Sequence, residues 1–157
     1  MYKPHHYKSS NIFPKQINTA GIALIKEFEG FHSTPYLCPS DVWTIGYGHT
    51  RTVHQDMRVS EQEADILLKD DIKIFERAVN KLVTVSLTEN QFSSLVCFAF
   101  NVGNKNLSTS ALLKLLNRGW YEQVPAQLLR WNRAKGEVLG GLARRRTAEA
   151  KLWNSTL

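Results

Sequence analysis

Residues 35–50 read PYLCPSDVWTIGYGHT, a mixture of prolines, glycines, aromatic and β-branched residues without helical periodicity. Such a stretch is typical of a short hairpin or a small sheet. Immediately upstream, residues 19–29 (TAGIALIKEFE) repeat apolar side chains at helical spacing, and Gly30 follows as a residue that commonly ends helices. We therefore expect a helix, a stop and then a small sheet.

Two capping boxes mark the helices that follow. Residues 60–63 (SEQE) precede an apolar repeat that continues to Leu82 and predicts a helix of about six turns. Asp71 is the one polar interruption of that repeat. Residues 88–91 (TENQ) form the second capping box and open the apolar stretch QFSSLVCFAFNVG. Further helices are expected over 109–117, 121–132 and 142–153.

Length and composition indicate a globular chain. The 157 residues correspond to one domain, and the 43% of hydrophobic and 22% of charged residues are ordinary values that exclude a disordered chain. We predict a basic flexible arm over residues 1–16 and a single domain over 17–157. The fold class is α+β, with a small sheet lobe, a long connecting helix and a helical second lobe.

Positive charge gathers at the two ends of the chain. The formal net charge of +6 divides into +3 over residues 1–15, −2 over 16–125 and +5 over 126–157. This asymmetry indicates a polyanionic partner, such as nucleic acid, an anionic membrane or an acidic wall polymer, or else a solvated basic helix face. No run of about 18 apolar residues and no apolar secretory stretch occur, so we expect the protein to stay at first in the cytoplasm.

Glu29, at the end of the first expected helix, is a candidate general acid. Phe28 and Phe31 flank it, and a carboxyl in apolar surroundings is more readily kept in its protonated form. The local alternative is a surface glutamate at a helix C-terminus.

The segment E-G-F-x5-L-C-P-S-D-V-W-T-I-G-Y-G-H-T, residues 29–50, resembles the active-site region of phage lysozymes, glycoside hydrolase family 24. The family's glutamate, its second catalytic position nine residues later and its threonine six residues further on correspond to Glu29, Cys38 and Thr44. The resemblance continues through the FNVG turn and the C-terminal GGLARRRTAEAKLW, and it covers about residues 17–153.

This resemblance implies a lysozyme-like two-lobed fold and hydrolysis of the β-1,4 bond between N-acetylmuramic acid and N-acetylglucosamine in peptidoglycan. In that reaction Glu29 donates a proton to the leaving oxygen, and Cys38 with Thr44 positions water or stabilises positive charge. No cofactor is implied. His5 and His6 lack spaced partners, so no metal site is expected there.

Cys38 departs from the usual pattern, because most members of the family carry Asp at that position. A minority carry Cys in a YLCP-type context, and this sequence looks like that branch. Asp41 is the rival second group. Cys97 lies in an apolar run and is expected to be a buried thiol, although a disulfide with Cys38, acting as a redox switch, is an open alternative.

Three further positions resemble the far wall of the substrate cleft: Phe100, Asn101 and Ser110. The alternatives are core packing for Phe100 and helix capping for Ser110. His49 is interpreted as structural, paired with a carboxylate. The basic helix 142–153 suggests contact with anionic lipid or lipopolysaccharide, and its alternative is a packed helix with solvated arginines.

The leading hypothesis is a monomeric endolysin that reaches the cell wall through a separate pore, as holins provide for phage lysozymes. A nucleic-acid-binding module is the alternative from another class, but no helix-turn-helix, zinc or aromatic-sheet signature supports it. A membrane-active protein that kills without catalysis is the third hypothesis.

Overall fold

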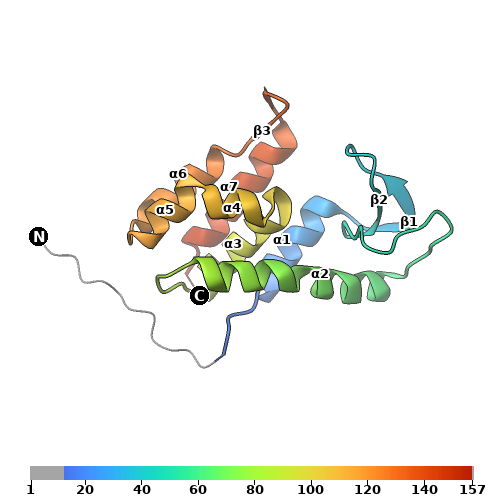
Figure 1. Ribbon diagram of the computed structural model, residues 1–157, viewed down its shortest axis with the longest axis horizontal. Coiled ribbons are helices and arrows are strands. Elements are labelled where there is room, and N and C mark those ends of the chain that lie inside the picture. Colours follow the sequence, from blue (N-terminus) through green and yellow to red (C-terminus); the bar gives the residue numbers. More distant parts are fainter. Residues whose placement is uncertain (1–12, 157) are drawn as a thin grey trace, which may run out of the picture. The chain divides into compact units, whose positions relative to one another are not determined.

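A computed structural model describes residues 13–156 of the chain (Figure 1). Their elements, in chain order, are α1 (Thr19–Glu29), β1 (His32–Leu37), β2 (Trp43–Gly46), α2 (Glu61–Leu82), α3 (Glu89–Val102), α4 (Asn104–Thr109), α5 (Ala111–Asn117), the 3-10 turn η1 (Tyr121–Gln123), α6 (Val124–Leu129), β3 (Arg133–Ala134), β4 (Glu137–Val138) and α7 (Gly140–Asn154). The mostly helical α+β class expected from the sequence is confirmed.

The described chain divides into two compact units. The sheet unit comprises residues 25–74, and the helical unit comprises residues 13–24 and 75–156. Of the arm expected over residues 1–16, the first twelve residues, including His5 and His6, lie outside the described part. The remainder is not loose: the Lys15 backbone N–H donates to Asn80 Oδ1 at 3.1 Å, and the Lys15 ammonium lies 2.8 Å from Glu89.

Helix ends follow the capping predictions. In α2 the Glu63 backbone N–H donates to Ser60 Oγ at 3.1 Å, and the Ser60 backbone N–H donates to Glu63 Oε2 at 2.7 Å. Thr88 and Gln91 form the same reciprocal pair at the start of α3. α1 ends where expected, because Gly30 takes a left-handed conformation with φ of +70°.

The sheet unit contains one antiparallel pair of strands. In the pairing of β1 with β2, Tyr36 lies opposite Thr44 and Leu37 opposite Trp43. The turn between the strands is closed by the Cys38 backbone N–H, which donates to the Val42 carbonyl at 3.1 Å. This register places Tyr36, Cys38 and Thr44 at one end of the hairpin.

The helical unit is built around α3, which is buried from Phe92 to Ala99 and packs against α7 (Figure 1). Cys97 lies within this stretch with no exposed surface, and its thiol donates to the Gly21 carbonyl at 3.2 Å. Burial raises the pKa of Cys97 well above its ordinary range. The prediction of a buried core thiol is confirmed, and both cysteines are free in the structure.

The structure adds elements that the sequence patterns did not predict. α4 is separate from α3 because Gly103, with φ of +91°, interrupts the helix. The expected helix over 121–132 is shorter, and a small hairpin of β3 and β4 follows it. Lys135 and Gly136 form its two-residue turn, both with positive φ, which is the conformation of a primed hairpin turn.

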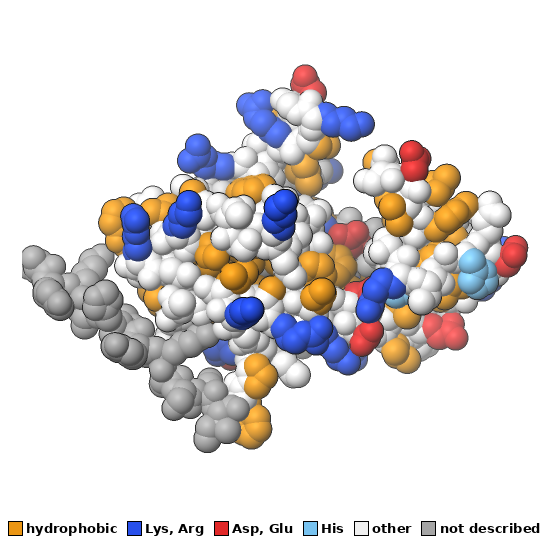
Figure 2. Space-filling view, in the orientation of Figure 1, with side chains coloured by type: hydrophobic (Ala, Val, Ile, Leu, Met, Phe, Trp, Pro, Cys, Tyr) orange, Lys and Arg blue, Asp and Glu red, His pale blue; other side chains and the backbone are white. Residues whose placement is uncertain are grey.

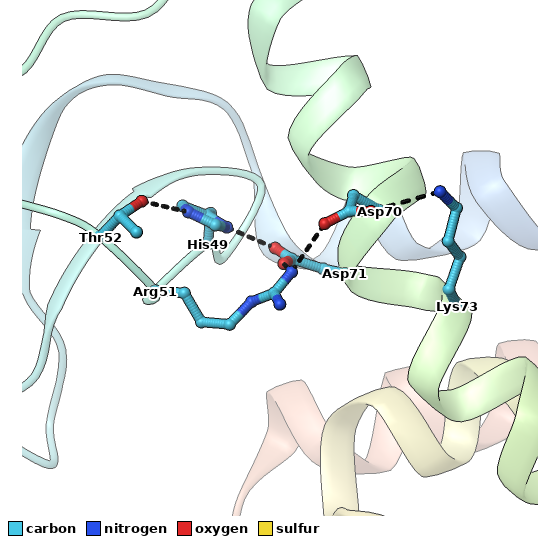
Figure 3. Close-up of polar contacts among 6 residues, drawn as sticks. All are labelled: His49, Arg51, Thr52, Asp70, Asp71 and Lys73. Atoms are coloured by element: carbon cyan, nitrogen blue, oxygen red, sulfur yellow. Dashed lines mark hydrogen bonds and ion pairs between the residues drawn. The ribbon is translucent and has the colours of Figure 1, made fainter.

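The polar interruption of α2 is explained by an ion cluster within the sheet unit (Figure 3). The Asp71 carboxylate lies 2.7 Å from His49 Nδ1. The Arg51 guanidinium lies 2.9 Å from the carboxylates of both Asp71 and Asp70. His49 is 4% exposed. The structural interpretation of His49, with a carboxylate partner, is therefore confirmed.

Asp71→Ala is expected to lower the free energy of unfolding by about 2 kcal/mol, because it leaves the buried His49 ring without its charged partner. Urea denaturation measures this. Asp70→Ala is the matched control, since Asp70 is exposed and, within the cluster, pairs only with the exposed Arg51 and Lys73. A clearly smaller loss of unfolding free energy is expected for this variant. Equal losses in the two variants would show that burial of the pair contributes nothing.

Candidate active site

Cys38 lies at the hairpin turn, partly exposed, in surroundings that favour its thiolate. The backbone N–H groups of Val42 and Ser40, and then the hydroxyls of Thr44 and Ser40, lower the pKa of the Cys38 thiol. A lowered pKa favours the thiolate, which is the form of cysteine that acts as a nucleophile or as a negative charge.

Thr44 comes from β2, directly across from Tyr36, and is 4% exposed. Its hydroxyl donates to the Val42 carbonyl at 3.0 Å, and it also lies beside the Cys38 thiol. The hairpin therefore brings Cys38 and Thr44 together, as the spacing of six residues led us to expect.

Glu29 is the last residue of α1 and is partly buried. A Cβ atom placed on Gly48 would lie only 3.1 Å from Glu29 Oε2, so the Gly48 backbone approaches the carboxyl closely. Tyr36 lies within electrostatic reach of both acidic groups, because burial and then the charges of Glu29 and Cys38 raise the pKa of its phenol. Within the sheet unit, Tyr36 therefore lies near both Glu29 and Cys38, and it is paired with Thr44 across the hairpin.

Gly48→Ala is expected to reduce hydrolytic activity about tenfold, because the added methyl group displaces the Glu29 carboxyl from its position. Gly119→Ala is the matched control: its φ of +83° is close to the +85° of Gly48, but nothing lies within 4 Å of the added methyl group. Steady-state rates and melting temperatures of both variants separate displacement of Glu29 from the backbone strain that they share. Equal rates in the two variants would mean that the contact is unimportant.

Asp41, the rival to Cys38, lies in the turn with φ of +58° and is exposed. Its backbone N–H donates to the Cys38 carbonyl at 2.8 Å. This backbone hydrogen bond of Asp41 therefore shapes the turn around the Cys38 thiol.

Sequence reasoning did not single out Tyr36, Ser40 or Gly48 as site residues. Tyr36 stands two residues before Cys38, and side chains at that spacing share a face of a strand, which is a signal that could have found it. Ser40 and Gly48 are recognised only from the folded hairpin, because their contribution is a close approach to Cys38 and to Glu29.

The other three predicted site residues belong to the helical unit. Phe100 packs edge-on against Phe75, with ring centroids 5.3 Å apart. Ser110 is buried and caps α5, where its hydroxyl accepts from the Leu113 backbone N–H at 3.1 Å and donates to the Leu107 carbonyl at 2.7 Å. Asn101 is exposed, and its amide oxygen accepts from Arg146. The contacts of Phe100 and Ser110 are those of their packing and capping alternatives.

The basic C-terminal helix differs from the expectation that its arginines are solvated. Of its three consecutive arginines, Arg144 is exposed, whereas Arg145 and Arg146 are 4% and 0% exposed and pair with the buried Glu149. Figure 2 shows Lys and Arg side chains spread over the visible face of the molecule, most of them standing singly. Much of the charge of α7 is therefore directed inward.

The described residues contain no cluster of His, Cys, Asp and Glu suited to a metal ion, and within residues 13–156 no helix has the length and apolar character needed to cross a bilayer.

Comparison with known proteins assigns the chain to a family. Residues 26–149, which include Glu29, Cys38 and Thr44, match the phage lysozyme family. The chain belongs to the phage lysozyme family. The mostly helical α+β fold of the chain matches that of known phage lysozymes.

Individual relatives match most of the chain. An endolysin of Bacillus phage B103 is 43% identical over 140 residues, which are 87% of this chain but only 53% of that protein. A SAR-endolysin of Escherichia phage Mu is 39% identical over 76% of this chain and 70% of its own length. The muramidase domain of SpmX from Asticaccaulis excentricus superposes with a TM-score of 0.86 at 37% identity, over 90% of this chain and 99% of that domain.

Proposed function

We propose that this chain is a muramidase of the endolysin type, which hydrolyses the β-1,4 bond between N-acetylmuramic acid and N-acetylglucosamine in peptidoglycan and lyses the host cell. The observation that carries the proposal is the position of Tyr36, which lies opposite Thr44 in the hairpin and within electrostatic reach of both Glu29 and Cys38. Family membership and relatives named endolysin support it. The matched part of the chain spans about half the length of the first of these relatives, so the activity is proposed for the lysozyme domain.

In the proposed reaction the two acidic groups have different tasks. Protonated Glu29 donates its proton to the leaving glycosidic oxygen as the C–O bond breaks. The Cys38 thiolate, whose pKa the surrounding donors lower, faces the positive charge that develops on the sugar, and Thr44 holds the water that supplies the new hydroxyl. Glu29 regains a proton when that water is deprotonated. The proposal includes membership of the branch of the family that carries cysteine at the second position.

The remaining expectations form part of the same proposal. Phe100, Asn101 and Ser110 contact the glycan, the catalytic domain spans residues 17–157, and the protein acts as a monomer without a cofactor. Contact with anionic lipid or lipopolysaccharide is restricted to the exposed cations of α7, Arg144 and Lys151, because Arg145 and Arg146 are buried. Release to the cell wall proceeds through a separate holin pore.

The proposal is tested by identifying the new reducing ends in purified peptidoglycan. Digests are reduced with borohydride, hydrolysed and analysed for sugar alcohols. A muramidase yields muramicitol, a glucosaminidase yields glucosaminitol, and an amidase yields neither. Muramicitol is the expected product. Glucosaminitol, or no sugar alcohol from folded and reduced protein, would contradict the proposed function.

A further inference from the structure

The exposed Asn101 is connected to a charged group in the interior of the helical unit. Its Oδ1 accepts a hydrogen bond from Arg146 Nη2 at 2.8 Å. Arg146 has no exposed surface, whereas Asn101 is exposed at the end of α3, so this hydrogen bond joins the core to the surface.

The chemistry of Arg146 decides which way the Asn101 amide faces. A guanidinium carries only donors and stays protonated, so the atom of Asn101 that meets it must be the oxygen. The amide nitrogen is then directed to the other side. Among residues 13–156, Asn101 Nδ2 donates to no protein atom, so its two N–H groups are left to an outside acceptor.

Arg146 is itself held on several sides. Its Nε and Nη2 lie 2.8 and 2.9 Å from the Glu149 carboxylate, and its guanidinium lies 5.1 Å from the centre of the Phe98 ring. The part of α7 that carries Glu149 is itself held against α3, because the Ser94 hydroxyl donates to the Glu149 backbone carbonyl at 2.8 Å. A cation this constrained cannot follow a rotation of the Asn101 amide.

We propose that Arg146 is a positioning residue that fixes Asn101 as a hydrogen-bond donor to an acceptor oxygen of the substrate. The inference rests on the proposed function and specifies what the substrate must offer at this point: the acetamido carbonyl of the glycan. A carboxylate of the stem peptide has the same acceptor chemistry, and the substrates used below distinguish the two sources.

Asn101→Asp is the deciding variant. A carboxylate still accepts from Arg146, as a charge-assisted hydrogen bond, so the melting temperature is expected to stay equal or rise. The outward group becomes an acceptor, so KM is expected to rise about tenfold with kcat little changed, the pattern of lost ground-state binding. Asn154→Asp adds the same charge at an exposed position of α7 and controls for general repulsion.

Variants of Arg146 test whether it acts through Asn101. Arg146→Lys keeps a group that only donates, and its KM is expected to stay near the wild-type value. Arg146→Gln combined with Glu149→Gln removes both charges together and introduces an acceptor beside Asn101, so the amide can turn and KM is expected to rise. An Arg146→Gln/Glu149→Gln enzyme with wild-type KM would overturn the proposal. If that double variant does not fold, Asn101→Asp decides alone.

Chemically altered substrates identify the acceptor. Wild-type KM is expected to rise on de-N-acetylated peptidoglycan, whereas Asn101→Asp is expected to be insensitive to that change. A rise on glycan strands stripped of stem peptides instead would overturn the acetamido assignment. Hydrolysis by wild type with an unchanged KM in Asn101→Asp would overturn the inference and leave the proposed function standing, whereas absence of hydrolysis by folded wild type would overturn the function itself.

Discussion

Glu29→Gln is expected to lower kcat on peptidoglycan by about 10²–10⁴-fold, the usual contribution of a general acid. The substituted amide keeps the size of the side chain beside Gly48 but has no proton to give to the leaving oxygen. The melting temperature is expected to change little, since Glu29 ends α1 at a partly exposed position. Turbidity clearing and reducing-sugar release measure the rate, and thermal unfolding confirms that the variant is folded.

Glu27→Gln is the matched control for this result. Glu27 lies two residues earlier in α1 and is exposed, so its substitution removes the same charge from the same helix without touching the site. Near-normal activity is expected. A folded Glu29→Gln variant that retained more than about a tenth of wild-type activity would rule out the role of general acid.

Cys38→Ser is expected to lower kcat by about 10²-fold or more, because a serine hydroxyl does not ionise in the range in which the thiol does. Cys38→Asp restores a negative charge at the same place and is expected to recover much of the activity. Asp41→Asn is the control that separates the two candidates. If Asp41 were the second group, Asp41→Asn would be the inactive variant and Cys38→Ser an active one.

The pH profile provides an independent readout of the same group. The thiolate is populated above the pKa of the thiol, and the amides of Val42 and Ser40 lower that pKa. The ascending limb of kcat/KM is therefore expected at lower pH than an ordinary cysteine, near pH 8.5, would give. In Cys38→Asp the limb is expected to move lower still, toward the range of carboxylates. An ascending limb that does not move in Cys38→Asp would mean that another group controls it.

Local signals predicted the front half of this chain well. The bounds of α1, the capping boxes of α2 and α3 and the position of the hairpin follow from side-chain spacing and from residues such as Gly30, which act within a few positions of themselves. The short hairpin of β3 and β4 was missed because each strand has two residues, too few to show alternation. Its one local signal is the turn at Lys135 and Gly136.

The site was predicted only as far as linear spacing reaches. Glu29, Cys38 and Thr44 are recognisable as a motif, but the approach of Gly48 to Glu29 depends on the folded hairpin. The burial of Arg145 and Arg146 could not be predicted, since a run of three arginines ordinarily indicates a solvated face. Their partner Glu149 stands within one helical turn of Arg146, but spacing does not tell an exposed pair from a buried one.

The difference in accessibility between the two cysteines allows thiol reactivity to report whether the chain is folded. Cys38 is accessible and has a lowered pKa, whereas Cys97 is fully enclosed and has a raised one. A thiol reagent should therefore consume one equivalent per native molecule and a second equivalent only after denaturation. The same difference directs a fluorophore or spin label to Cys38 alone without mutagenesis, so that the proposed site can be blocked and followed at a single position.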